Sequence, residues 1–400
     1  MTISVYMETL AYKYGGAEAY TASLISFIQK YYPNANVKVI TEHLANRNIL
    51  SASQLIEMQN SAYGLNIKNA NFSVSYFDFE KIDEHSSKNR LEKIFRIIKR
   101  EIYANYRFKK IRDFSKGSDL FINCSFNVVS GLGKKNICIV HFPRVRCSES
   151  GINKRLFWFR KKSQKRDFEY ANSYDLYLPN SFFTAEHLKN RWGTVDSKIK
   201  VLYPPVKGVN SSIGKKNNQI LLCSRICRPK KIDLVLWALS ESAFLKQNAR
   251  MILAGSVIGE DEEFITEIKN DFPNVEFHFD PTRSELERLY SESAIFIHAM
   301  GLNEKNPENF EHFGITTVEA MSAGCVPVVI NKGGQKEIVT DGTGFRWDSL
   351  DELVEKTEWL IKNPDEAEKI RQASMERSRF FTGKIFEDRL KDILSEVAHA

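Results

Sequence analysis

The chain lacks the segments that direct proteins into or across membranes. No run of about 18 apolar residues occurs, so the sequence predicts no membrane-spanning helix. The first seven residues alternate in polarity without a basic leader or a small-residue cleavage site, so we expect no secretory signal. With 11 prolines, 20 glycines and no low-complexity tract or long repeat, the sequence excludes disordered, collagen-like and solenoid proteins.

Cysteine pairs are absent as well. The six cysteines are scattered without a C-x-x-C pair, most of them in apolar, strand-like stretches: Cys124, Cys138, Cys147, Cys223, Cys227 and Cys325. Such spacing predicts reduced, buried thiols in a cytoplasmic protein. It argues against a disulfide framework and against a zinc site.

What remains is the composition of a large globular protein. A chain of 400 residues with 42% hydrophobic and 27% charged residues can bury two or three domain cores. Short apolar runs alternate with helical segments along the whole chain, as a parallel sheet with crossover helices requires. The predicted fold class is α/β, with two Rossmann-like, doubly wound domains that face one another across a cleft.

The strand pattern and a linker set the expected boundaries. We predict strands at residues 3–6, 37–41, 119–123, 136–141, 176–179, 199–202, 219–224, 251–254, 275–279, 295–299 and 326–330. The polar segment 204–218, punctuated by proline and glycine, is a predicted linker. The expected domains are residues 1–205 and 206–380, followed by a helix at 381–400 that packs back on the first domain.

Positive charge is concentrated in the first half of the chain. Residues 1–205 carry 32 basic and 18 acidic side chains, whereas residues 206–400 carry 25 and 32. Residues 88–116 combine 11 basic residues with apolar positions at helical spacing, and residues 154–166 combine seven basic residues with aromatic ones. Both patterns are typical of contact with an anionic membrane surface. A solvated helix face explains each stretch alone equally well, and no nucleic-acid-binding signature accompanies them.

Two segments have the composition of anion sites. Gly15 and Gly16 precede a predicted helix at 17–31, whose first N–H groups would face an anionic ligand. Arg225 and Lys231 follow the strand at 219–224. The planar guanidinium of Arg225 and the ammonium group of Lys231 would bind one diphosphate. A plain turn and a charged surface loop are the alternatives. For the second segment we prefer the anion site, because it follows the ligand-binding edge of the sheet.

The most specific pattern runs from Glu311 to Gly324. Gly314 permits an open helix start, residues 315–323 form the helix, and Gly324 closes it. Glu311 therefore lies in the loop before the helix and Glu319 in the second turn. Amides at a helix start suit phosphate oxygens and carboxylates suit sugar hydroxyls, so the pattern favours a nucleotide sugar. The amides concerned belong to Gly314, Ile315 and Thr316.

Glu311 and Glu319, with seven residues between them, resemble the paired-glutamate motif of family 4 retaining glycosyltransferases of the GT-B fold. Other markers of that family follow in its order: residues 15–18, His141 after a strand, residues 178–181, Arg225 with Lys231, and residues 333–339. The resemblance covers about residues 1–347. One departure is Ile232, which stands where a glycine commonly follows the family's lysine.

The resemblance implies a role for each site residue. In the second domain Arg225 and Lys231 would hold the donor diphosphate, Glu319 the ribose and Glu311 the donor sugar, with Gly255 at the edge expected to bind the base. Gly15 and Gly16 of the first domain would approach the phosphates, and His141 would lie beside the sugar. The implied catalytic set is Glu311, Arg225, Lys231 and His141. Two cations would replace a metal, and the chain has no Asp-x-Asp pair, so we expect no cofactor.

The expected function is metal-independent transfer of a hexose from a GDP- or UDP-sugar to a hydroxyl of a glycan. We expect a lipid-linked acceptor at the cytoplasmic face of an anionic membrane, in the synthesis of cell-surface polysaccharide or glycoconjugate. Two other classes stay open. A nucleotide-sugar 2-epimerase of the same fold would act without an acceptor, and a membrane-associated scaffold would have no activity. The presence of the full set of site residues argues against a noncatalytic scaffold.

Overall fold

The chain folds into two compact units. The computed structural model describes residues 1–12, 15–44, 48–79, 90–126, 129–143, 165–209, 216–257 and 262–399. The first unit contains Met1–Asn180, Thr184–Leu202 and the tail from Arg389 onward, and the second contains Ser181–Phe183 and Tyr203–Asp388. The chain thus passes from the first unit to the second near residue 203, and it returns within the last helix.

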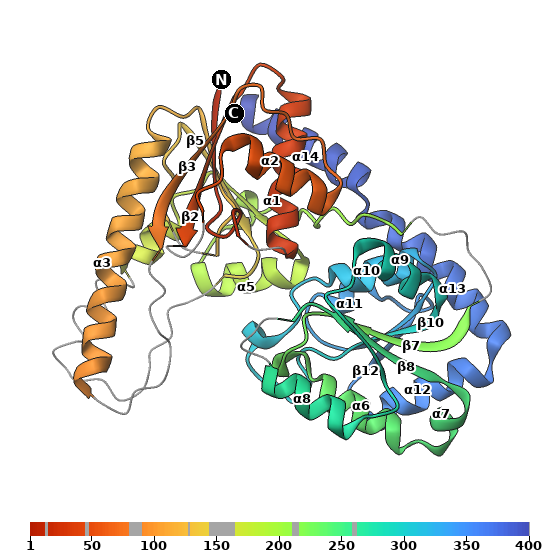
Figure 1. Cartoon of the computed structure of the whole chain (residues 1–400). Coiled ribbons are helices and arrows are strands. Elements are labelled where there is room, and N and C mark those ends of the chain that lie inside the picture. Colours follow the sequence, from red (N-terminus) through yellow and green to blue (C-terminus); the bar gives the residue numbers. More distant parts are fainter. Residues whose placement is uncertain are drawn as a thin grey trace. The chain divides into compact units, whose positions relative to one another are not determined.

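A parallel six-stranded sheet forms the centre of the first unit, in the order β3-β2-β1-β4-β5-β6. Its strands are β1 (Thr2–Tyr6), β2 (Asn36–Leu44), β3 (Phe72–Phe79), β4 (Leu120–Asn123), β5 (Lys135–Val140) and β6 (Leu176–Pro179). Helices α1 (Gly16–Tyr31), α2 (Ala52–Tyr63), α3 (Arg90–Ser115) and α5 (Phe182–Trp192) connect or follow these strands (Figure 1). All residues of β4 and β6 are buried, as expected where helices cover both faces of a sheet.

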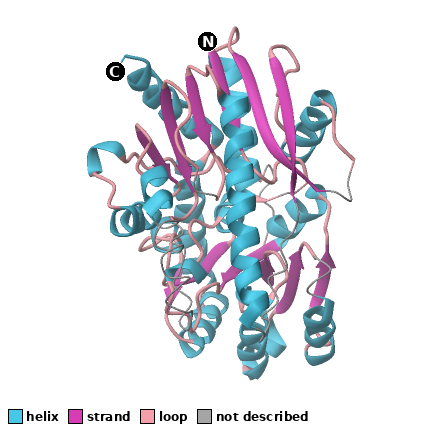
Figure 2. Ribbon diagram, turned by 90° about the vertical axis from the view of Figure 1, so that its left-hand side faces the viewer, coloured by secondary structure: helices cyan, strands magenta, loops and turns pink. Residues whose placement is uncertain are grey.

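The second unit repeats this plan with a sheet ordered β12-β11-β10-β7-β8-β9. Its strands are β7 (Asn217–Cys223), β8 (Arg250–Gly255), β9 (Glu276–Phe279), β10 (Ser293–His298), β11 (Val326–Ile330) and β12 (Phe345–Trp347). Its helices are α6 (Ile232–Glu241), α7 (Ala243–Asn248), α8 (Glu262–Asp271), α9 (Arg283–Glu292), α10 (Ile315–Ser322), α11 (Gln335–Ile338), α12 (Leu350–Lys362) and α13 (Pro364–Ser378). Figure 2 shows both sheets in magenta with their helices in cyan.

The two sheets have the same topology. In each, the first and fourth strands of the unit are central neighbours, so the strand order reverses between β1 and β4 and between β7 and β10. Ligands of doubly wound folds bind outside the carboxyl ends of the strands at this point of reversal. The prediction of two Rossmann-like α/β domains is confirmed.

Three details differ from the predicted strands. Residues 199–202 form no continuous strand: Ile199 makes an isolated bridge with Tyr177, while Lys200 N and Leu202 N donate to carbonyl oxygens of β6. The sequence analysis also omitted β3 and the three-residue β12. In the predicted linker, Val206 bridges to Thr382, residues 210–215 lie outside the described residues, and β7 already begins at Asn217.

The last helix, α14 (Gly383–His399), belongs to both units. From Arg389 onward it packs in the first unit, where Leu390, Ile393 and Leu394 are buried. Lys391 lies 5.4 Å from the centre of the Tyr31 ring of α1, and Glu396 pairs with Lys200. The first unit is therefore completed by the end of the chain.

Helix α3 combines a packed end with an exposed one. Ile111, near its C-terminal end, is fully buried. Phe95, Ile98 and Ile102 are 68%, 49% and 64% exposed, and in Figure 1 the N-terminal half of α3 extends beyond the strands of its own sheet. The amphipathic helix predicted within residues 88–116 is present, whereas residues 154–164 of the second basic stretch lie outside the described residues.

Two other expectations concern membranes and cysteines. Among the described residues, no helix is both long and apolar enough to cross a membrane. Five cysteines are buried free thiols, at positions 124, 138, 223, 227 and 325, and Cys147 lies outside the described residues.

Candidate active site

The best-formed cluster of charged side chains lies where the strand order of the second sheet reverses. β7 ends at Cys223 and β10 ends at His298, so the segments that follow these neighbouring strands start at the same edge. A small cavity there is lined by Ser224, Lys230 and His298, among others. Its position matches the ligand-binding edge of a doubly wound sheet.

Glu311 is the centre of this cluster. Its Oε2 atom lies 2.7 Å from Lys230 Nζ and 3.0 Å from His298 Nε2. Burial by itself raises the pKa of Glu311, but Lys230 and the His298 hydrogen bond outweigh it and hold that pKa well below the usual range. The carboxylate is therefore ionised at neutral pH. Its side chain remains 22% exposed, which leaves it accessible to a ligand.

The two adjacent lysines contact different carboxylates. Lys231 Nζ lies 2.7 Å from Glu304 Oε1, whereas Lys230 reaches Glu311. Lys231 has φ 57° and ψ 31°, a left-handed conformation that glycine adopts most readily. Position 231 thus has the backbone expected of the family's glycine, which makes Lys230 the residue before it. The sequence analysis missed Lys230, although the Lys230-Lys231 doublet was visible.

Arg225 has a different environment from the lysines. It lies two residues after the end of β7, and its side chain is exposed. The sequence-predicted pair of Arg225 and Lys231 is consequently at the expected edge, but Lys230 is the cation that contacts Glu311. The proposed roles of Arg225 and Lys231 on a diphosphate remain predictions.

The start of α10 has the open geometry that the sequence predicted. Gly314 caps the helix with φ 126°, a conformation that other residues rarely adopt. A Cβ at this position would also lie 2.4 Å from Gln335 Nε2. Ile315 and Thr316 are the first two residues of the helix, so their amides precede its hydrogen-bonded interior. Gly334 N donates to the Glu311 carbonyl at 2.8 Å, which fixes the loop before the helix.

Glu319 is buried within the second unit and has two partners. Its Oε1 accepts from Arg283 Nη1 at 2.6 Å, and its Oε2 accepts from the Tyr290 hydroxyl at 3.2 Å. Burial raises the pKa of Glu319, and Arg283 partly offsets that rise. Each carboxylate oxygen can accept a further hydrogen bond, so these contacts are compatible with the predicted binding of ribose. Arg283 is a second residue that sequence reasoning left unassigned.

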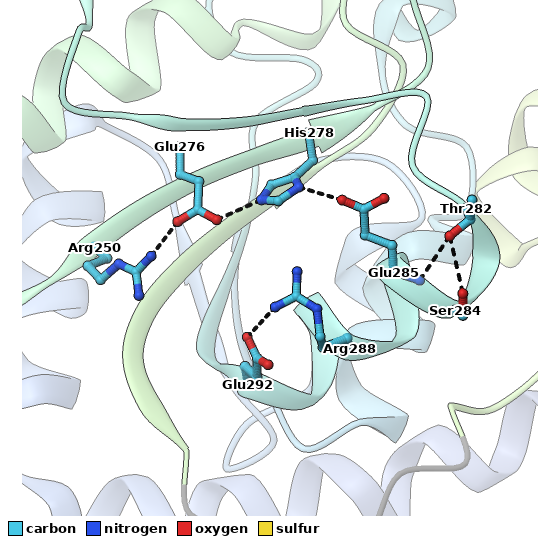
Figure 3. A network of polar contacts seen from close by, with 8 residues as sticks. All are labelled: Arg250, Glu276, His278, Thr282, Ser284, Glu285, Arg288 and Glu292. Carbon is cyan, nitrogen blue, oxygen red and sulfur yellow. Dashed lines mark hydrogen bonds and ion pairs between the residues drawn. The ribbon is translucent and has the colours of Figure 1, made fainter.

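A polar network anchors α9, the helix that carries Arg283. Figure 3 shows His278 of β9 between two carboxylates, with Nε2 2.8 Å from Glu276 and Nδ1 2.7 Å from Glu285 of α9. Both ring nitrogens of His278 thus lie within hydrogen-bond distance of a carboxylate oxygen. The hydrogen bond from His278 lowers the pKa of Glu276, and Arg250 lowers it by a smaller amount. The network therefore fixes the first turn of α9 against β9.

Gly255 ends β8 beside the end of β7. A Cβ at position 255 would lie 1.7 Å from the carbonyl oxygen of Ser224, so only glycine permits this approach. Val257 N donates to Asp280 Oδ1 at 3.0 Å, which joins the loops after β8 and β9. The predicted base-binding edge is thus formed by closely packed backbone.

The remaining predicted residues belong to the first unit. Gly15 is the N-cap of α1 and Gly16 its first residue. The Gly15 N–H donates to the Tyr63 hydroxyl at 3.1 Å. His141 follows β5 and is 7% exposed, with Nε2 2.9 Å from the Cys124 carbonyl oxygen. Since a carbonyl only accepts, Nε2 carries the proton. This contact anchors the ring beside the end of β4.

Comparison with known proteins gives a family match for part of the chain. Residues 209–377 match the family model "Glycosyl transferases group 1". This segment, less than half of the chain, is similar in sequence to the group 1 glycosyltransferases. This match covers nearly all of the second unit, including Glu311, Glu319 and both lysines.

Relatives of this chain include named mannosyltransferases. It is 28% identical over 204 residues to the GDP-Man:Man(3)GlcNAc(2)-PP-Dol alpha-1,2-mannosyltransferase of Dictyostelium discoideum, covering 45% of this chain and 39% of that protein. It is 24% identical over 314 residues to the Alpha-1,3/1,6-mannosyltransferase ALG2 of Candida glabrata, covering 63% and 66%. The match with the first of these thus spans about two fifths of the relative's length.

The chain shares its fold with solved structures over nearly its whole length. The crystal structure of Anabaena Alr3699/HepE in complex with UDP matches with a TM-score of 0.66 at 17% identity, covering 99% of this chain and 100% of that one. The crystal structure of WaaG, a glycosyltransferase involved in lipopolysaccharide biosynthesis, matches with a TM-score of 0.63 at 13% identity, covering 98% and 99%. The GT-B fold is therefore confirmed.

Proposed function

We propose that this protein transfers mannose from GDP-mannose to a hydroxyl of a lipid-linked glycan, with retention of the anomeric configuration. The named relatives support the donor and the lipid-linked acceptor. The observation that carries the proposal is Glu311, an ionised and accessible carboxylate held by Lys230 and His298 at the edge of the second sheet. A carboxylate in this position is suited to hydrogen-bond the hydroxyls of a donor sugar.

The charged groups of the site suit departure of a nucleoside diphosphate. In front-face transfer the acceptor oxygen bonds to C1 of mannose while the bond from C1 to the β-phosphate oxygen breaks. The bonding electron pair leaves with GDP, and the acceptor proton passes to a phosphate oxygen. Arg225 and the two lysines would stabilise this developing charge, because cations already positioned where negative charge develops lower the barrier to transfer.

We propose that these cations make a metal or other cofactor unnecessary. Three of them, Arg225, Lys230 and Lys231, follow β7 within seven residues of the sequence. Lys230 and Lys231 are 17% and 21% exposed, so they are largely shielded from water. Transfer in the presence of EDTA tests this part of the proposal.

For the acceptor we propose presentation at the cytoplasmic face of an anionic membrane. The support comes from α3, where Phe95, Ile98 and Ile102 are exposed on one face of a helix. Residues 88–116, which include it, carry 11 basic and three acidic residues. Exposed apolar side chains among basic residues suit a bilayer that carries negative charge.

The decisive experiment is a transfer assay with purified protein. GDP-mannose, UDP-glucose and UDP-N-acetylglucosamine are each incubated with polyprenyl-diphosphate-linked glycans in EDTA. We expect a mannosylated lipid only with GDP-mannose, and none with the Glu311→Gln variant. A sugar nucleotide converted to its epimer without acceptor would establish the epimerase. If the protein neither bound nor turned over any sugar nucleotide, the noncatalytic scaffold would be the remaining hypothesis.

A further inference from the structure

The contacts of Glu311 are distributed unequally between its two oxygens. Lys230 Nζ and His298 Nε2 both lie on Oε2, at 2.7 and 3.0 Å. Within the described part of the chain, no hydrogen bond or ion pair involves Oε1. Two contacts on one oxygen anchor the carboxylate, and the other oxygen keeps its capacity to accept from a ligand.

His298 has a rigid position from which to fix Glu311. It is the last residue of β10, a central strand that pairs with β7 on one side and β11 on the other. Glu311 by contrast lies in the loop between β10 and α10. Side chains on sheet strands are held more accurately than side chains on loops. The hydrogen bond therefore attaches a loop carboxylate to the centre of the sheet.

The chemical state of His298 suits a donor role. Its side chain is 3% exposed, and burial lowers its pKa, so the ring is neutral. A neutral ring has one N–H, and the carboxylate beside Nε2 requires it there. Nδ1 is then a buried acceptor with no partner. Because an unpartnered polar atom costs stability, an apolar residue would serve packing better, and the histidine calls for a functional reason.

We propose that His298 is a positioning residue that orients Glu311, with Nε2–H on Oε2, so that Oε1 accepts a hydroxyl of the donor sugar. This inference rests on the proposed transferase function and names a further residue for it. His298 itself does not touch the sugar in this arrangement. Lys230 supplies the charge that keeps Glu311 ionised, and His298 fixes the orientation of the Glu311 carboxylate.

Two substitutions separate the hydrogen bond from packing. In His298→Gln the amide Nε2 can replace the imidazole donor, whereas His298→Leu has an apolar side chain and no donor. We expect His298→Leu to lower kcat about tenfold or more, as loss of a partner that orients a functional ligand does, with little change in the KM for GDP-mannose. His298→Gln should recover most of this loss. Equal activity of wild type and His298→Leu would overturn the inference.

The pH profile provides a readout that altered packing alone would not move. Glu311 is faced by Lys230 from the segment after β7 and by His298 from β10. Loss of the His298 donor removes one of the groups that hold the pKa of Glu311 down. The acidic limb of kcat should therefore move to higher pH in His298→Leu and return in His298→Gln. An unshifted limb in His298→Leu would contradict the proposal.

A double-mutant cycle completes the test. If His298 acts through Glu311, adding His298→Leu to Glu311→Gln should cause little further loss of the residual activity. Additive losses would show an independent role for His298 and overturn the inference. A thermal melt of each variant with and without GDP checks folding and nucleotide binding. Inactivity of the wild type would refute the proposed function, whereas an active wild type with a normal His298→Leu refutes only the role of His298.

Discussion

Lys230 and Lys231 are neighbours in sequence with different partners, Glu311 and Glu304. We predict that Lys230→Met lowers transfer at least as much as Glu311→Gln, because the variant loses both a phosphate-side cation and the partner of Glu311. Lys231→Met should have the smaller effect. Steady-state kinetics with GDP-mannose as the varied substrate checks this order.

Lys231 also suggests its own control. Its left-handed backbone favours glycine, so Lys231→Gly should fold at least as well as the wild type, by thermal melting. A larger loss of activity in Lys231→Met than in Lys230→Met would contradict the structural assignment and favour the sequence-based one.

The contribution of Glu311 to the stability of the fold should decrease as the pH falls. Its folded pKa lies well below that of an unfolded glutamate, about 4.3. The ionised group therefore stabilises the fold above that pH, and this contribution is lost as the pH falls through the folded pKa. We predict that Glu311→Gln lowers the melting temperature at neutral pH and that the difference narrows in acid. A constant difference from neutral to acidic pH would contradict the assigned pKa shift.

The two glutamates could be predicted from sequence, but their partners could not. The spacing from Glu311 to Glu319 is set within one loop and one helix, so a local pattern reveals it. Lys230, His298 and Arg283 reach these carboxylates from segments 81, 13 and 36 residues away. Such pairings depend on the order of strands in the sheet. The strand order cannot be predicted from the spacing of apolar residues or from local composition.

At the scale of single elements, the start of α5 depends on a distant carboxylate. Glu337 accepts from Phe182 N at 2.8 Å, from Phe183 N at 2.6 Å and from the Tyr203 hydroxyl at 3.0 Å. We predict that Glu337→Ala destabilises this helix start by about 1–2 kcal/mol, the usual cost of losing an N-terminal cap. The loss should appear as roughly tenfold faster amide exchange at Phe182 and Phe183.

Lys336, the exposed neighbour of Glu337, supplies the matched control. Lys336→Ala changes the same short helix, α11, without touching α5. It should leave exchange at Phe182 and Phe183 unchanged. If Glu337→Ala also left that exchange unchanged, Ser181 or another local group would have to cap the helix.

Strands were predictable wherever burial on both faces made them continuous apolar runs. β6 and β11 match the predicted residues 176–179 and 326–330 end to end. β3 was missed although Phe72–Phe79 alternates polar and apolar residues, because it is an edge strand that pairs only with β2. β12 has three residues, too few for any periodicity to appear. The missed strands therefore both lie at sheet edges.

For the molecule as a whole, α3 predicts reversible binding to lipid. The triple variant Phe95→Ser, Ile98→Ser, Ile102→Ser should bind vesicles of phosphatidylglycerol and phosphatidylcholine several-fold more weakly than the wild type, since buried apolar area contributes to such binding. Binding of the wild type should fall as salt is added, because salt screens the attraction between basic residues and anionic lipid. Vesicle sedimentation measures both effects.

Trp237 provides the control for that experiment. It is 55% exposed and lies on α6 of the second unit. Trp237→Ser should bind vesicles as strongly as the wild type does. If any loss of exposed apolar surface weakened vesicle binding, Trp237→Ser and the triple variant of α3 would both bind more weakly. Failure of the wild type to sediment with anionic vesicles at low salt would remove α3 from the proposal and leave the proposed transfer reaction intact.

The return of α14 to the first unit has a consequence for the order of events on the ribosome. Leu390, Ile393 and Leu394 are core residues of a unit whose other strands and helices are translated before residue 203. The second unit is encoded almost entirely between these two parts, so it can finish folding first, although its sequence begins later. Until residue 394 has left the exit tunnel, the first unit displays an uncovered apolar surface beside α1. The segment that completes the first unit is therefore translated after almost all of the second unit.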